Sequence, residues 1–133
     1  MKYIKIYEGF LDKMYEKLPE VKLAMSLANF MNMVKPELEC KYKRNSDGLW
    51  IVTHNEIKLV YMEIFINDVQ ITFFDHHQNE YTEDILDFLL YVFDTDIIDA
   101  DIEKDDIPEV ISKLTIEKYE FFLREKDANK YNL

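Results

Sequence analysis

Three histidines and their acidic neighbours are the residues whose types could carry metal chemistry. His54 ends one expected strand, and His76 and His77 end another, which places all three at the same edge of the expected sheet. With Asp75 and Glu80 they could supply imidazole and carboxylate ligands. Adjacent residues of a strand point to opposite faces, however, and the chain has no helical His-x-x-x-His pair. The pattern therefore favours histidines that merely end strands, and we predict neither metal nor cofactor.

Cys40 is the one candidate thiol nucleophile, with His54 as its candidate base. The expected strand register places the two side chains on opposite faces of a hairpin, and free cysteines are commonly buried among apolar side chains. We therefore predict that Cys40 is buried and inert. Only two glycines occur, Gly9 and Gly48, which excludes a glycine-rich phosphate loop and a Gly-x-Ser-x-Gly elbow. The sequence thus predicts a protein that is not an enzyme.

The segment 94–109 is strongly acidic. Its acidic residues are Asp94, Asp96, Asp99, Asp101, Glu103, Asp105, Asp106 and Glu109, against a single lysine. An EF-hand calcium loop opening at Asp94 fails, because Ile98 falls where an oxygen ligand belongs and Asp99 falls where glycine is needed. Three interpretations remain: a solvated acidic loop, a protein-binding surface and a non-standard cation site. Interspersed isoleucines are expected to anchor the segment to the core, and fixed carboxylates suit the docking of a basic partner.

The overall charge narrows the classes of partner. The 133 residues carry a formal net charge of −11, which repels a phosphate backbone, so direct nucleic-acid binding is not expected. No apolar run approaches the roughly 18 residues that span a bilayer, and no secretory signal is visible. A single cysteine excludes an internal disulfide. We expect a cytoplasmic protein, and the bias towards lysine, asparagine and isoleucine favours a bacterial or phage origin.

Helices are expected before and after a central sheet. Apolar residues recur at helical spacing over 7–18, closed by Pro19, and again over 20–34, stopped by Pro36. Thr82 is a plausible N-cap for a helix through Phe93. Short helices are expected over 108–114 and 115–123, and the tail from residue 126 is expected to fray. With 48% hydrophobic residues and only two glycines and three prolines, the chain should form one domain over residues 1–133.

Between these helices the hydrophobic period changes from 3.6 to 2. Residues 38–43, 49–54, 57–66 and 69–75 are the expected strands, and short polar breaks separate them. The fold class predicted is therefore α+β, with a four-stranded antiparallel meander over about residues 38–75, flanked by N-terminal helices on one face and C-terminal helices on part of the other. If each break is a short hairpin, every strand residue can be assigned to a face.

One face collects the core residues, and the other is unusually aromatic for a wet surface. The core face comprises Leu38, Cys40, Tyr42, Leu49, Ile51, Val60, Met62, Ile64, Ile66, Val69, Ile71 and Phe73. The opposite face comprises Trp50, Val52, Leu59, Tyr61, Phe65 and Phe74, mixed with polar residues. Trp50, Tyr61 and Phe65 are the aromatic residues that we expect at a partner interface.

Three functional hypotheses follow. The first is a binding protein that neutralises a basic protein, such as an immunity protein for a toxin nuclease or a phage-encoded inhibitor. The candidate partner-binding residues are Asp94, Asp96, Asp99, Asp101, Glu103, Asp105, Asp106, Trp50, Tyr61 and Phe65. The alternative is a structural or adaptor domain that forms a homo-oligomer through the aromatic sheet face. The third is an enzyme or small-ligand protein that uses the edge bearing His54, Asp75 and His76.

Overall fold

The fold is α+β with an antiparallel sheet, seen in a computed structural model that describes residues 13–46, 48–74, 83–95 and 99–131. The elements in chain order are α2 (Pro19–Val34), η1 (Pro36–Leu38), β1 (Lys41–Asn45), β2 (Gly48–Val52), β3 (Lys58–Ile64), β4 (Asp68–Phe73), α3 (Glu83–Val92), β5 (Asp99–Glu103), η2 (Lys104–Asp106), α4 (Ile107–Lys113) and α5 (Ile116–Tyr131). Residues 7–12 of the helix expected over 7–18 lie outside the described residues, as do Asp75, His76, His77, Glu80 and Asp96.

The sheet has five strands, in the order β1-β2-β3-β4-β5, rather than the four predicted. The additional strand, β5, comes from the acidic segment and pairs antiparallel with β4, with Gln70 opposite Asp101 and Ile71 opposite Ala100. Its side chains alternate between exposed acids and buried apolar residues, because Ala100 and Ile102 complete the core while their neighbours face outward. The segment is therefore an edge strand at this point and not a loop.

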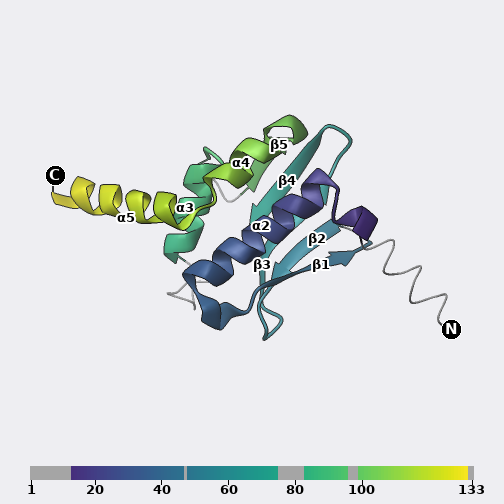
Figure 1. Cartoon of the computed structure of the whole chain (residues 1–133), viewed down its shortest axis with the longest axis horizontal. Coiled ribbons are helices and arrows are strands. Elements are labelled where there is room, and N and C mark those ends of the chain that lie inside the picture. The colour runs from purple at the N-terminus through teal and green to yellow at the C-terminus, as the bar shows by residue number, and fades with distance from the viewer. Residues whose placement is uncertain (1–12, 47, 75–82, 96–98, 132–133) are drawn as a thin grey trace.

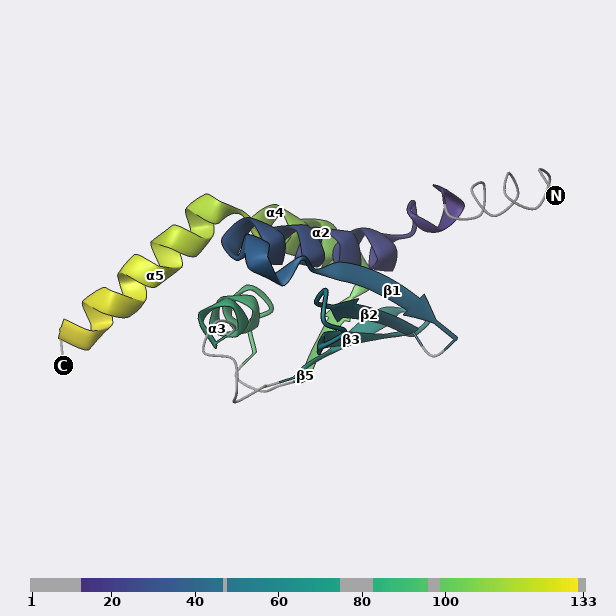
Figure 2. The same ribbon diagram turned by 90° about the horizontal axis from the view of Figure 1, so that it is seen from below.

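The helices α2 and α4 lie side by side over one face of the sheet (Figures 1 and 2). Their apolar residues enter the same core, with Leu23 and Leu27 of α2 fully buried and Ile107 of α4 nearly so. Helix α3 packs beneath α2, where Phe88 contacts Phe30 at a ring separation of 5.1 Å. The expectation that C-terminal helices cover part of the other sheet face is not confirmed, since α4 shares its face with α2 (Figure 2).

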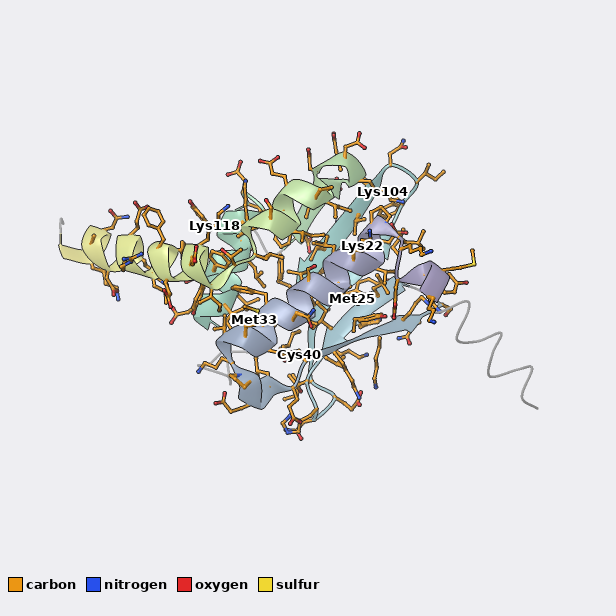
Figure 3. The ribbon with its side chains drawn as sticks, viewed as in Figure 1. Lys22, Met25, Met33, Cys40, Lys104 and Lys118 are labelled. Atoms are coloured by element: carbon orange, nitrogen blue, oxygen red, sulfur yellow. The ribbon has the colours of Figure 1, made fainter. Side chains whose placement is uncertain are left out.

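Asn32 joins α2 to the start of the sheet. Its side-chain amide donates to the Cys40 carbonyl at 2.8 Å and its carbonyl accepts from the Cys40 backbone N–H at 2.5 Å. This reciprocal pair satisfies both backbone groups at the point where the chain enters β1, so it fixes the approach of the helix to the strand. Cys40 itself is buried, as predicted, and Figure 3 shows it between the end of α2 and the sheet.

The pairing register confirms most of the predicted division between the two faces. Leu49, Ile51, Val60 and Met62 are all fully buried on the core face. Ile66 was wrongly assigned to that face: it lies in the β3–β4 turn and is 92% exposed, because the strand already ends at Ile64.

Leu59 was wrongly assigned to the opposite face. The pairing of β2 with β3 shifts between Ile51 and Val52, so strict alternation fails there, and Leu59 is buried in the core cluster.

Gly48 is required where β1 turns into β2. Its φ of 154° lies in a region that side chains rarely adopt, and a Cβ atom at this position would come within 2.3 Å of the Met62 carbonyl oxygen. Because that atom belongs to the backbone of β3, it cannot move aside cheaply. The predicted Asn-Ser-Asp-Gly turn is therefore also a place of close backbone approach.

Helix α5 extends to Tyr131, further than the end near residue 123 expected from its apolar period. Beyond the apolar contacts of Tyr119 and Phe122, the ion pairs of Lys126 with Asp84 and Asp87, at 3.4 and 2.7 Å, connect the helix to α3. Polar contacts thus continue the helix where hydrophobic periodicity ends. Within the described residues, none of the helices is long and apolar enough to cross a membrane.

Candidate functional site

The pairing of β4 with β5 brings the acidic segment onto the sheet face that carries Trp50 and Tyr61. Asp99 lies opposite Thr72 and Asp101 opposite Gln70, on the side away from α2 and α4. We call this side the open sheet face, because no described helix lies over it (Figure 2). Two groups of residues that the sequence predicted as separate candidates therefore share one surface.

An aromatic group occupies the middle of the open sheet face. The ring of Trp50 stacks on Phe74 at 5.8 Å and lies 4.3 Å from the ring of Tyr61, as predicted for its neighbours. The Lys58 ammonium sits 4.5 Å above the Trp50 ring, a cation–π distance. The side chains of Trp50, Tyr61 and Phe74 are all half-buried, so part of each aromatic ring remains accessible at the open sheet face.

An exposed apolar tip ends the β3–β4 hairpin beside the acidic strand. Its residues Ile64, Phe65 and Ile66 are 39%, 47% and 92% exposed. The backbone N–H of Phe65 donates to the Asp68 carbonyl at 2.9 Å, which closes the turn, and Lys104 donates its N–H to the Asn67 carbonyl. The hairpin tip is thereby attached to the end of β5, so its apolar side chains are held next to the carboxylates.

Four carboxylates line the β5 edge of the open sheet face, and we call them the acidic strip: Asp68, Asp99, Asp101 and Glu103. Asp68 lies opposite Glu103, and its side chain interacts with that of Asp101. Loss of solvation, followed by the Asp101 charge and hydrogen bond, raises the pKa of Asp68 above its usual 3.8, while Lys104 acts weakly in the opposite direction. The carboxylates of the acidic strip are therefore close enough for Asp101 to disfavour the charged form of Asp68.

Replacing Asp101 with asparagine is expected to stabilise the protein at neutral pH. A carboxyl whose pKa is raised by folding contributes stability below its unfolded pKa and loses that contribution as the pH rises through the folded pKa. The gain from Asp101→Asn should thus be present at about pH 7 and absent at about pH 3, where the Asp68 carboxyl is protonated and the Asp101 charge no longer repels it. Thermal unfolding at the two pH values measures it. Asp105→Asn, in exposed η2, makes the same charge change and should give a smaller gain; equal gains would contradict the pairing.

The β1 edge of the open sheet face is basic, and one carboxylate offsets part of its charge. Lys41 and Lys43 of β1 both contact Glu56, the first at 3.8 Å and the second by a short hydrogen bond. The hydrogen bond from Lys43 holds the pKa of Glu56 below its usual value. The charge of the open sheet face therefore changes from one edge to the other, with lysines and Glu56 at β1 and the acidic strip at β5.

The structure separates the remaining predicted acidic residues. Asp105 and Asp106 are exposed in η2, directly after the acidic strip. Asp94 is exposed at the end of α3 with a left-handed φ of 54°, and it lines a different surface hollow together with Tyr91 and Lys113. Asp96 lies outside the described residues. Asp68 is a further acidic residue of the acidic strip: the sequence predicts it in the turn between two strands, whereas β4 begins at this residue.

Neither histidine nor cysteine chemistry gains support from the geometry. His54 is exposed, with its Nδ1 3.4 Å from the Leu38 carbonyl and 4.0 Å from Glu39. Burial raises the pKa of Cys40 to about 11, so its thiolate is scarce at neutral pH. Among the described residues no three His, Cys, Asp or Glu side chains are placed to hold a metal ion, and the predicted edge with His76 and His77 lies outside them.

Comparisons of the chain with protein-family models, with curated proteins and with solved structures find no match. The function must therefore be argued from the surface itself.

Proposed function

We propose that the protein is a small acidic binding protein that neutralises a basic protein target. An immunity protein for a toxin nuclease and a phage-encoded inhibitor are the two forms that this function takes most naturally. One observation carries the proposal: β5 sets Asp99, Asp101 and Glu103 on the sheet face that bears Trp50 and beside the exposed hairpin tip.

In this proposal the acidic strip attracts a positively charged protein surface and disfavours a negatively charged one. Loss of solvation is the main cause of the raised pKa of Asp68 and repulsion by the Asp101 charge is the second, and a cationic surface would relieve that repulsion on binding. A net charge of −11 adds a long-range field that attracts basic proteins and repels nucleic acid. A basic nucleic-acid-handling protein fits both requirements.

In this proposal the hairpin tip provides the apolar contacts of the interface, which the acidic strip cannot provide. Interfaces are commonly held by a few well-buried aromatic or aliphatic anchors surrounded by polar residues. Phe65 and Ile66 are apolar, exposed and held by backbone hydrogen bonds next to carboxylates, so they match that arrangement. We assign them the role of anchor residues in a partner cleft with a basic rim.

Site-specific photo-crosslinking tests the proposal. A photoreactive residue at Gln70, half-buried in the open sheet face, should capture one predominant basic protein in cells that carry the gene and its neighbours. The matched control is Met33, which is 58% exposed on the outer side of α2 (Figure 3). Capture of the same proteins from both positions, or of acidic proteins only, would sink the proposal.

The homo-oligomer remains the second candidate because of the charge gradient across the same face. Two copies facing each other could set the β1 edge of one, with Lys41 and Lys43, against the β5 edge of the other. Glu56 already contacts both lysines and offsets part of their charge, however, and the copies repel each other through their net charge. Sedimentation velocity of the pure protein decides between the candidates, since only an assembly domain should be oligomeric without a partner.

A further inference from the structure

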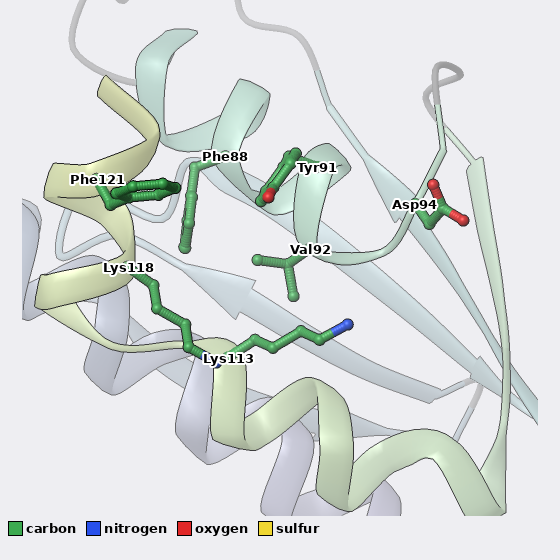
Figure 4. A pocket seen from close by; sticks show the side chains of 7 residues that line it. All are labelled: Phe88, Tyr91, Val92, Asp94, Lys113, Lys118 and Phe121. Atoms are coloured by element: carbon green, nitrogen blue, oxygen red, sulfur yellow. The ribbon is translucent and has the colours of Figure 1, made fainter. Parts of the chain in front are cut away.

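A hollow of about 440 Å³ lies among α3, α4 and α5, away from the open sheet face. Figure 4 shows Phe88, Tyr91 and Phe121 on one side of it and the side chains of Lys113 and Lys118 on the other. Its volume is within the range of small-molecule sites, which are mostly apolar with a few polar groups. The hollow therefore has the size and composition of a ligand site.

Two large aromatic rings at this hollow are exposed to solvent. Tyr91 is 61% exposed and Phe121 is 50% exposed, although both adjoin the buried ring of Phe88. Exposed aromatic side chains that gather around a concavity commonly mark a binding site, because a ligand that covers them removes apolar area from water. Flat rings on the protein favour a flat ring system in the ligand.

The lysines give the hollow a charge opposite to that of the whole protein. Lys113 pairs with Glu109 one helical turn away at 3.5 Å, on the surface, and Lys118 makes no ion pair with any residue in the described part of the chain. The single carboxylate of the lining, Asp94, lies at the far end of the hollow in Figure 4. Two lysine side chains on the side of the hollow opposite the aromatic rings thus provide a counter-charge for one acidic group of a ligand.

We propose that this hollow binds a planar aromatic molecule that carries one acidic group, with its rings on Tyr91 and Phe121 and its anion between Lys113 and Lys118. This site is separate from the acidic strip, and its ligand has the opposite charge preference from the partner proposed above. A neutral ring system would gain only the apolar contact, and an anion without rings would gain only an exposed charge contact, which is weak.

A matched pair of fluorescent dyes tests the site. Anilinonaphthalene sulfonate is anionic and carries a flat naphthalene ring system, whereas phenylnaphthylamine has the same rings without the sulfonate. We expect saturable binding of one sulfonate dye per folded chain. The double variant Lys113→Met/Lys118→Met should weaken this binding roughly tenfold, because both exposed charge contacts with the sulfonate are lost together. Binding of the neutral dye should change by less than about twofold, and Tyr91→Ala should weaken both dyes.

Two controls keep the result specific. Circular dichroism and thermal unfolding should show that each variant folds, which is expected because the Lys113–Glu109 pair is exposed and contributes little to stability. The variant Phe65→Ser/Ile66→Ser removes the hairpin tip and should leave the dye affinity unchanged. The proposal is overturned by non-saturable binding, by an unchanged sulfonate affinity in the double lysine variant, or by loss of dye binding in the tip variant. None of these outcomes bears on the basic partner.

Discussion

Replacing Phe88 with alanine should destabilise the protein by about 3–5 kcal/mol, the usual cost of removing a fully buried phenylalanine. Phe88 is completely buried and its ring lies 5.1 Å from Phe30, 5.3 Å from Tyr119 and 5.6 Å from Phe122. It therefore joins α3 to both α2 and α5. Since domains of this size are stable by only about 5–15 kcal/mol, the loss is a large part of the total.

Denaturant unfolding of the Phe88→Ala variant measures this cost. The melting temperature should fall by roughly 10–20 °C, and α5 should become the first site of proteolysis because its aromatic contacts depend on this ring. If the alanine variant does not fold, Phe88→Leu gives a smaller loss of the same kind. The matched control is Phe121→Ala, half-exposed in α5, which should cost less than about 1 kcal/mol. Similar costs for the two alanine variants would mean that α3 and α5 do not pack as described.

Replacing Phe65 with alanine should reduce affinity for the partner by about 2 kcal/mol, or roughly thirtyfold in Kd, without a comparable change in stability. The side chain is 47% exposed in the free protein, so the fold loses little, whereas an anchor buried in a partner cleft loses its whole contact. Titration calorimetry with the partner captured from Gln70 measures the effect. Phe121→Ala removes an equally exposed ring elsewhere and should bind like the unmodified protein; equal affinity of both variants would remove Phe65 from the interface.

The regular part of the fold could be predicted because its signals are local. The change from helical to alternating period separated α2 from the sheet, and short polar breaks fixed the antiparallel register of β1 to β4. The register placed Trp50 near Tyr61 and Phe74, and together with the usual burial of free cysteines it predicted the burial of Cys40. Errors arose where a bulge interrupts the alternation, at Leu59, and where a strand ends early, before Ile66.

The fifth strand was missed although its signal is present. Asp99, Ala100, Asp101, Ile102 and Glu103 alternate between polar and apolar over five residues, as a half-buried edge strand should. Only two residues of this strand face the core and the other three are acidic, so its alternation is weaker than the signal of the acidic run around it. Which strand it would join is a non-local matter, because α3 lies between β4 and β5 in the chain. That pairing is what unites the two halves of the candidate interface.

The hollow among α3, α4 and α5 could not be predicted either, because its lining comes from helices whose relative placement is also non-local. Tyr91 and Phe121 lie off the apolar stripes of their helices, which is consistent with their exposure but does not predict that they line one hollow. Whether they do depends on the angle between α3 and α5, and helix periodicity does not contain that angle. The lysines of the pocket likewise come from two different helices.

The salt dependence of association with the captured partner is the measurement that tests the acidic docking surface most directly. The association rate at low ionic strength should exceed that at about 0.5 M salt by one to three powers of ten, because exposed charges are screened within a few ångströms at high salt. The variant Asp99→Asn/Asp101→Asn/Glu103→Gln keeps the shape of β5 and should remain folded, yet it should associate more slowly at low salt and with a flatter salt response. A rate for the unmodified protein that does not change with salt, or the same salt response in the variant, would contradict the account.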